Sequence, residues 1–180
     1  MTTVEPIRSK KDIEKIKKIL ANQSQRNLVL FCFGINSGLR ISDILKLNVG
    51  DVKNKNFIQL KEQKTGKYKK FPLNDNIKKL LSDYVLNKKE DLPLFTTIFN
   101  NRMDRITAYR IINKACKMAK IEGNIGTHTL RKTFGYFYFK KYNNILMLQK
   151  IFNHSTPDVT LRYIGIEEDK IYMSYRKFVL

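Results

Sequence analysis

The chain has 180 residues, with 35 lysines and arginines against 16 aspartates and glutamates, so its net charge is +19. The apolar share of 42% excludes a disordered basic tail, and this length supports a sizeable core without disulfides or a structural metal. A folded domain this basic favours a polyanionic partner, either nucleic acid or another anionic surface. Part of the charge also fits AT-rich coding, since lysine, asparagine and isoleucine are all abundant.

The first half of the chain predicts three helices and a hairpin. Ser9 is placed to cap a helix that buries isoleucines at helical spacing, and a second helix over 24–37 ends at Gly38. A short amphipathic helix over 39–47 follows. Segments 56–61 and 68–73 have strand character, and their link contains a turn glycine, so they predict a β-hairpin.

The second half predicts helices alone. Thr127 is placed to cap one of them, and Thr156 followed by Pro157 starts another, which Gly165 ends. The expected helices are 77–85, 104–119, 127–141, 145–152, 156–165 and 167–178. The fold class is therefore mostly α with a small antiparallel β-hairpin, in a single domain over 1–180.

The cysteines and the apolar segments indicate where in the cell the protein is located. Cys32 and Cys116 lie far apart without a CxxC pattern, which favours buried free thiols in a reducing cytosol. Two histidines and two cysteines supply too few ligands for zinc, so no metal site is expected. The start of the chain lacks a signal peptide, and the longest apolar run, Leu28–Ile35, is too short to span a bilayer. A soluble cytoplasmic protein is predicted.

Chemistry-bearing residues occur at a few informative positions. His128 and Arg131 lie one helical turn apart, and Arg40 interrupts an apolar stretch. Taken singly, His128 and Arg131 fit ordinary surface residues and His154 fits an ordinary loop residue, whereas Arg40 either snorkels or points at an anionic group. Attack on a phosphodiester without a metal requires arginines to hold the phosphate, a lysine and a histidine to move protons, and a tyrosine as nucleophile. The candidates are Arg40, Lys64, His128, Arg131, His154 and Tyr163.

Four segments in this order resemble the motif boxes of the tyrosine recombinases, the phage integrase family. They are Ser37-Gly38-Leu39-Arg40-Ile41-Ser42-Asp43-Ile44, Lys64-Thr65-Gly66-Lys67 leading to Phe71-Pro72-Leu73, Thr127-His128-Thr129-Leu130-Arg131-Lys132-Thr133-Phe134, and Asn153-His154-Ser155 with Thr160-Leu161-Arg162-Tyr163. The resemblance covers nearly the whole chain, from about residue 12 to the end. One such box would be weak, but four in order are a strong signal.

The resemblance implies a role for each residue. Tyr163 would attack the scissile phosphate and form a 3′-phosphotyrosyl link, while Arg40 and Arg131 would clamp the phosphate. Lys64 would protonate the 5′ oxygen, His128 would assist proton transfer, His154 would hydrogen-bond the phosphate, and Asp43 would position the site through an arginine. No cofactor and no metal would be needed, because the covalent link keeps the phosphodiester energy.

Two departures from the family pattern stand out. Asn153 replaces the glycine that usually precedes the histidine at the position of His154. Asparagine is the non-glycine residue that best tolerates a left-handed backbone. Most members also carry an N-terminal core-binding domain, whereas barely ten residues here precede the first expected helix. Two interpretations stay open: an excised catalytic fragment, or a short member like the fimbrial phase-variation invertases.

Double-stranded DNA is the expected partner, bound by a tetramer, and a nucleoid-associated protein of a bacterium or a phage is expected. Contacts to its backbone are expected from Lys61, Lys67, Lys69, Lys70 and Lys132. The last helix either covers the protein's own core or docks in trans on a neighbouring protomer. Tyr136, Tyr138, Tyr142, Tyr172 and Tyr175 are rival tyrosines, but only Tyr163 has the required spacing from His154.

Site-specific recombination, for integration, excision or inversion of DNA, is the predicted function. A type IB topoisomerase that relaxes DNA could use the same residues, but the short chain and the spacing from His154 to Tyr163 favour the recombinase. A non-catalytic DNA-binding regulator of the same fold is the second alternative. In that case, Tyr163→Phe would leave every phenotype intact.

Overall fold

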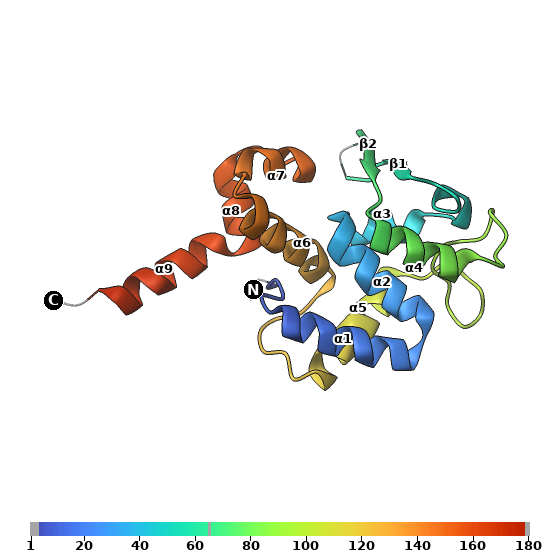
Figure 1. Ribbon diagram of the computed structural model, residues 1–180, viewed down its shortest axis with the longest axis horizontal. Coiled ribbons are helices and arrows are strands. Elements are labelled where there is room, and N and C mark those ends of the chain that lie inside the picture. Colours follow the sequence, from blue (N-terminus) through green and yellow to red (C-terminus); the bar gives the residue numbers. More distant parts are fainter. Residues whose placement is uncertain (1–3, 65, 179–180) are drawn as a thin grey trace.

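The computed structural model describes residues 4–64 and 66–178, and it consists mainly of helices with one two-stranded antiparallel sheet (Figure 1). This confirms the predicted fold class. In chain order the elements are α1 (Lys10–Gln23), α2 (Gln25–Ser37), α3 (Ile41–Lys46), η1 (Val49–Asp51), β1 (Phe57–Lys61), β2 (Tyr68–Pro72), α4 (Asp75–Val85), α5 (Arg105–Met118), α6 (Thr127–Tyr142), α7 (Ile145–Phe152), α8 (Pro157–Ile164) and α9 (Ile166–Lys177).

Several helix ends lie where the local sequence predicts them. The Ser9 hydroxyl accepts a hydrogen bond from the backbone amide of Asp12 at the start of α1. Thr156 is the N-cap of α8 and directly precedes Pro157. Gly38 ends α2 and Gly165 ends α8, both with a left-handed backbone. The prediction of Thr127 as a cap is wrong, because α6 begins at Thr127 itself and its N-cap is Gly126.

The hairpin forms in the predicted place. Its register pairs Phe57 with Pro72 and Lys61 with Tyr68, which leaves 62–67 as the link between the strands. Ile58 is fully buried, while its neighbours Phe57 and Gln59 point to the exposed side, as alternation along a strand requires. One face of the hairpin therefore packs on the core.

Buried apolar side chains form two clusters. The larger one includes residues of α1 to α5 and the hairpin, and the smaller one includes residues of α6, α7 and α8. Helix α6 joins the two, because Leu130 belongs to the first cluster and Tyr136 to the second. Gly135 lets α6 approach the smaller cluster closely, since a Cβ there would lie 2.6 Å from Ile164. The predicted site residues come from both sides of this junction.

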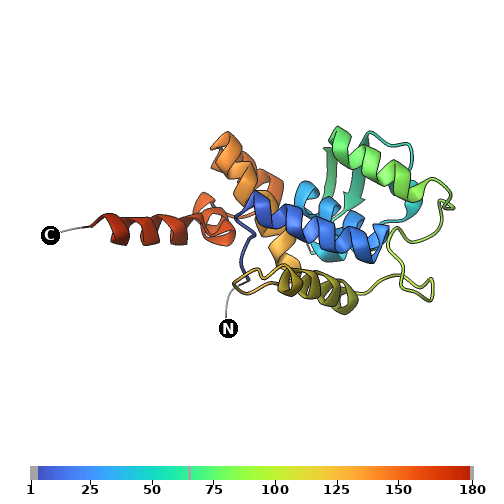
Figure 2. The same cartoon turned by 60° about the horizontal axis from the view of Figure 1, so that its bottom comes forward.

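Helix α9 extends away from the rest of the molecule (Figures 1 and 2). Ile166 at its start is buried, but Ile171, Tyr175 and Phe178 are 53%, 77% and 70% exposed. These side chains therefore do not cover the protein's own core, which was one of the two interpretations of this segment.

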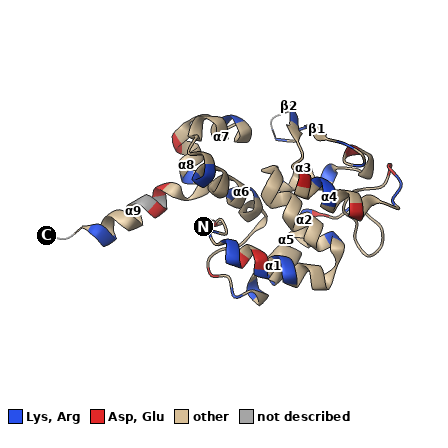
Figure 3. Ribbon diagram, in the orientation of Figure 1, with Lys and Arg blue, Asp and Glu red and all other residues tan. Residues whose placement is uncertain are grey.

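Lysines and arginines are spread over the fold rather than gathered at one end (Figure 3). Cys32 and Cys116 are free and buried, as predicted, and burial raises the pKa of each thiol to about 11. Within the described parts of the chain, no helix is both long and apolar enough to cross a membrane.

Candidate active site

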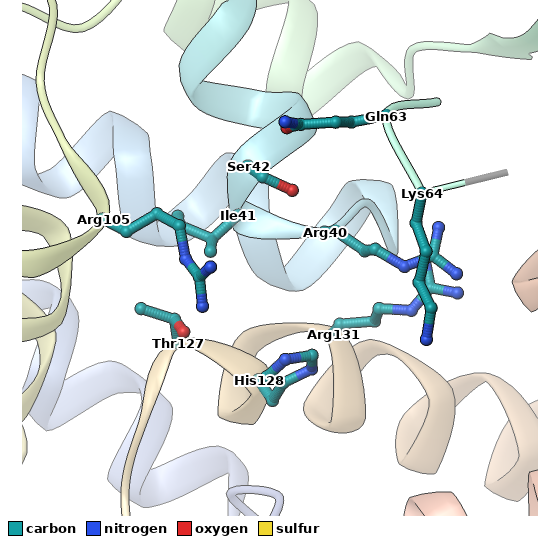
Figure 4. A pocket seen from close by; sticks show the side chains of 9 residues that line it. All are labelled: Arg40, Ile41, Ser42, Gln63, Lys64, Arg105, Thr127, His128 and Arg131. Carbon is teal, nitrogen blue, oxygen red and sulfur yellow. The ribbon is translucent and has the colours of Figure 1, made fainter. Parts of the chain in front are cut away.

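Four of the predicted residues line a single cavity, which lies between α3, the hairpin link and α6 (Figure 4). Arg40 immediately precedes α3, Lys64 lies in the hairpin link, and His128 and Arg131 lie on one face of α6. The side chains of Lys64, Arg40 and Arg131 converge on one region of the cavity (Figure 4). Such a concentration of positive charge suits a phosphate group.

Arg131 is held rigidly from both sides of the junction. Its side chain donates from Nη1 to the Gly38 carbonyl at 2.6 Å and from Nη2 to the Phe152 carbonyl at 2.8 Å. Its guanidinium carbon also lies 4.3 Å from the centre of the Phe152 ring, and the residue is only 2% exposed. The guanidinium retains further N–H donors for a ligand in the cavity.

Arg40 and Asp43 both hold the hairpin. Arg40 Nη1 lies 3.1 Å from the Glu62 carboxylate, in an ion pair whose side chains are 14% and 3% exposed. The buried Asp43 accepts the backbone amide of Gln63 through Oδ1 at 2.9 Å. Action of Asp43 through an arginine stays a prediction, consistent with its charge opposing the fall in the pKa of Arg131, while its hydrogen bond fixes the residue before Lys64.

Tyr163 on α8 and His128 on α6 are paired across the two helices. Tyr163 Oη lies 3.2 Å from His128 Nδ1, within reach for proton transfer. Burial, followed by Arg131 and other nearby cations, lowers the pKa of His128, which favours the neutral form that can accept a proton. Burial raises the pKa of Tyr163, and Arg131 and Arg40 partly offset this effect. The tyrosine therefore stays protonated until a base acts on it.

His154 lies beside this pair. It follows Asn153, which adopts the expected left-handed backbone with φ of 53°. His154 Nδ1 lies 3.1 Å from the Thr160 hydroxyl, and that hydroxyl donates to the Thr156 carbonyl. The hydroxyl proton is thus engaged, so Nδ1 is the donor to Thr160, and Nε2 is left to face other groups. The His154 and Tyr163 rings meet edge to face, with centroids 5.0 Å apart.

Stability of the free protein should depend on His154 at mildly acidic pH. Burial, then Arg131, Arg40 and Lys64, lowers the pKa of His154 to about 4, whereas an unfolded histidine titrates near 6.5. The unfolded chain therefore takes up a proton more readily, so stability is full above about pH 6.5 and falls as the pH drops toward about 4. We expect the urea midpoint of the wild type to fall more steeply between about pH 7 and about pH 5 than that of His154→Gln. Parallel curves for the two proteins would contradict this assignment.

The five lysines expected to contact DNA differ in their surroundings. Lys61, Lys67 and Lys70 are exposed on the hairpin, as a DNA-binding surface requires. Lys69 is partly buried and donates to the Ile151 carbonyl at 2.9 Å. Lys132 is 6% exposed, and its amine lies 5.1 Å from the centre of the Tyr163 ring. The exposed three are thus the better placed to meet a DNA backbone, and DNA contact stays a prediction for all five.

The rival tyrosines lie elsewhere. Tyr136 is buried in the smaller cluster, and the Tyr138 and Tyr142 rings pack together with centroids 4.8 Å apart. Tyr172 and Tyr175 lie on the exposed part of α9. Among the described residues, Tyr163 is the tyrosine hydrogen-bonded to a histidine.

Two residues at the site were missed by the sequence interpretation. Arg105, the first residue of α5, lines the cavity, and Glu62 pairs with Arg40. Arg105 directly follows a helix cap in a segment without a recognisable motif, so no signal distinguished it. Glu62 could have been found, because it is an acidic residue beside Lys64 in a chain where acids are scarce.

Comparison with known proteins agrees with this geometry. The model of the phage integrase family matches residues 8–169. The probable integrase/recombinase YoeC of Bacillus subtilis is 45% identical over 179 residues, a match that covers 99% of this chain and 98% of YoeC. A probable integrase/recombinase of Acholeplasma phage L2 is 30% identical over 146 residues, which are 80% of this chain and 50% of the relative. The chain thus spans nearly all of the first relative but half of the second.

Solved structures share the fold. A crystal structure of XerA recombinase matches with a TM-score of 0.76 at 21% identity, and the match covers 99% of this chain and 66% of the XerA chain. The catalytic domain of bacteriophage HP1 integrase matches with a TM-score of 0.68 at 26% identity, and the match covers 89% of this chain and 87% of the HP1 chain. The fold is therefore that of tyrosine recombinase catalytic domains. Together with the extent of the family match, this shows that the chain belongs to the phage integrase family.

Proposed function

We propose that this protein is a site-specific DNA recombinase that cuts and rejoins DNA through a 3′-phosphotyrosine at Tyr163. The observation that carries the proposal is the 3.2 Å contact between Tyr163 Oη and His128 Nδ1, beside a cavity lined by Arg40, Arg131 and Lys64. These groups are the nucleophile, base, phosphate clamp and acid that such a reaction requires. One catalytic domain over 1–180 carries them all.

Each group has one task in the reaction. Arg40 and Arg131 bind the non-bridging oxygens and stabilise the charge that grows on them in the transition state. Tyr163 Oη forms a bond to phosphorus while its proton passes to His128. The bond from phosphorus to the 5′ oxygen breaks, and Lys64 gives that oxygen a proton. When DNA places the negative charge of the phosphate beside His154, the imidazole takes up a second proton and donates a hydrogen bond from Nε2 to the phosphate. The reverse steps rejoin the strands.

The recombinase is favoured over the two alternatives. A regulator that does not cut DNA has no need of a hydroxyl 3.2 Å from a neutral base beside clustered cations. A topoisomerase of the same chemistry is less well supported, because the relatives are named integrase/recombinase and tyrosine recombinase. We therefore assign integration, excision or inversion of DNA, in the nucleoid of a bacterium or a phage-infected cell.

Assembly on DNA follows from the reaction, because exchange between two duplexes needs four active sites. A lambda integrase with a TM-score of 0.72 at 16% identity was solved as a tetramer bound to a Holliday junction. In this chain α9 exposes Ile171, Tyr175 and Phe178, and these apolar residues suit docking in trans on a neighbouring protomer.

A direct test uses plasmids that carry the DNA flanking the protein's own reading frame. Incubation followed by denaturation should leave protein attached to 3′ ends, and plasmids with two sites should yield recombinant products. Relaxation without strand exchange between sites would support the topoisomerase instead. Binding without any covalent product would support the regulator.

Metal removal should leave the reaction intact. The charges on Arg40, Arg131 and Lys64 occupy the roles that a metal ion plays in other phosphoryl transfers. We expect the yield of covalent complex in excess EDTA to stay within about twofold of the yield in Mg²⁺, apart from the effect of Mg²⁺ on DNA binding itself. A strict metal requirement would instead indicate a nuclease mechanism.

A further inference from the structure

The hairpin and α7 belong to different hydrophobic clusters, yet lysines of β2 and of the hairpin link connect them. Ile58 and Leu73 anchor the hairpin in the larger cluster, whereas Leu148 and Phe152 anchor α7 in the smaller one. Lys69 donates from Nζ to the Ile151 carbonyl at 2.9 Å, and Lys67 Nζ lies 3.3 Å from Asn153 Oδ1. Both lysines therefore reach the C-terminal end of α7, directly before His154.

The end of α7 needs these donors. The last carbonyls of a helix have no partner within it, and that end carries a partial negative charge. The carbonyls of Gln149 and Lys150 accept the amide of Asn153. The next two carbonyls, of Ile151 and Phe152, accept from Lys69 and Arg131 respectively. Lys69 thus supplies a donor to one of the helix-end carbonyls that cannot be paired within a regular helix.

The position of Lys69 is costly for a lysine. Burial and then Arg131 lower the pKa of its amine to about 8, Arg40 adds to this, and Glu62 and Asp43 oppose it. A lysine that served only to hold DNA would be better placed at the surface, as Lys70 is on the opposite face of the same strand. The hydrogen bond to α7 accounts for a partly buried amine at this point.

The other end of the hairpin link is attached to the larger cluster. Asp43 holds the amide of Gln63, and Arg40 pairs with Glu62. Lys64 follows these two anchored residues. Its position relative to α3 is therefore set by the first anchor, while its position relative to α7 and α8 depends on the lysine bonds.

We propose that Lys69 is a positioning residue that fastens the hairpin to the end of α7, and so holds Lys64 over the same phosphate as His154 and Tyr163. This inference rests on the proposed function, in which Lys64 protonates the leaving 5′ oxygen. In this proposal, which replaces the expected DNA contact of Lys69, the lysine acts through Lys64 and contacts neither the DNA nor the reacting atoms itself. Its loss should therefore impair the protonation of the leaving group more than any other part of the reaction.

A DNA substrate with sulfur in place of the bridging 5′ oxygen isolates this step. When Tyr163 attacks it, the bond from phosphorus to sulfur breaks and the thiolate leaves without needing a proton. Lys69→Met should form covalent complex about 10²-fold more slowly than the wild type on the oxygen substrate. On the sulfur substrate it should come within about threefold of the wild type, as Lys64→Met should.

Two further variants sharpen the comparison. Lys69→Arg keeps a donor for the Ile151 carbonyl and should recover most of the rate on the oxygen substrate. Lys88→Met is the matched control, because its amine is also partly buried with a pKa lowered to about 8, but it packs on the Tyr84 ring in the larger cluster. It should react at the wild-type rate on both substrates.

Salt dependence separates positioning from DNA contact. If Lys69 held a phosphate, Lys69→Met would flatten the slope of log Kd against log salt concentration by about one unit. We expect an unchanged slope. A flattened slope, an equal loss on the oxygen and sulfur substrates, or no loss on either would each overturn the proposal.

Hydrogen exchange in the free protein tests the fastening without any reaction. The amide of Glu62 donates to the Lys67 carbonyl, and the amide of Gly66 donates to the Glu62 carbonyl. Both amides should exchange faster in Lys69→Met than in Lys88→Met or the wild type. Unchanged exchange would overturn the proposal. A wild type that forms no covalent complex on either substrate would refute the proposed function instead. The exchange result would then still decide whether Lys69 fastens the hairpin to α7.

Discussion

Tyr163→Phe is expected to abolish the covalent protein–DNA complex while leaving DNA binding intact. The substitution removes the hydroxyl that lies 3.2 Å from His128, and phenylalanine offers no atom that can attack phosphorus. The ring should stay in place, because it packs edge to face on Phe152 and His154, with centroids 5.6 and 5.0 Å away. A nicked suicide duplex made from the flanking DNA, followed by denaturing electrophoresis, measures the covalent product.

Tyr138→Phe provides the matched control. Tyr138 packs on Phe134 and Tyr142 and does not line the cavity that holds Lys64, so the loss of its hydroxyl should leave the covalent yield unchanged. Affinity for the same duplex should be equal in both variants and the wild type. A covalent complex formed by Tyr163→Phe would show that another residue is the nucleophile.

The local fold could be predicted because its determinants are short in range. Helix ends are set by local preferences, of the side chain at Ser9 and of the backbone at Gly38, Pro157 and Gly165. The hairpin is set by two strand-forming segments joined by a link that contains the turn glycine Gly66. The same holds for the left-handed backbone at Asn153. At α6 the local signal misled, because Thr127 is a favourable cap residue, yet the N-cap is Gly126, whose amide donates to the Thr129 hydroxyl.

Contacts between distant segments could not be predicted in this way. The bond from Asp43 to the Gln63 amide, the ion pair of Arg40 with Glu62 and the burial of Lys69 all depend on how the hairpin folds back on α3 and α7. Strand alternation placed Lys69 and Lys70 on opposite faces, but no local pattern showed which face would meet another helix. The motif boxes therefore predicted which residues gather at the site but not what holds them there.

Arg131→Met is expected to impair both cleavage and stability. Its loss leaves the buried carbonyls of Gly38 and Phe152 without their donor, at about 1–3 kcal/mol each in the free energy of unfolding. In the proposed reaction it also removes a donor to the phosphate, which should slow formation of the covalent complex by at least about 10²-fold. Urea unfolding and the suicide duplex, both at a temperature where the variant stays folded, measure the two effects.

Arg102→Met separates the two effects. Arg102 also donates to backbone carbonyls, those of Leu45 and Leu47, but it does not line the cavity that holds Lys64. It should lower the urea midpoint yet cleave at the wild-type rate once folded. If Arg131→Met cleaved as well as Arg102→Met, Arg131 would be a structural link between the two clusters rather than part of the phosphate clamp. Arg131→Lys should be intermediate in stability between the wild type and Arg131→Met, because an amine can donate to one of the two carbonyls. It should still cleave slowly, since lysine lacks the planar guanidinium that binds two phosphate oxygens at once.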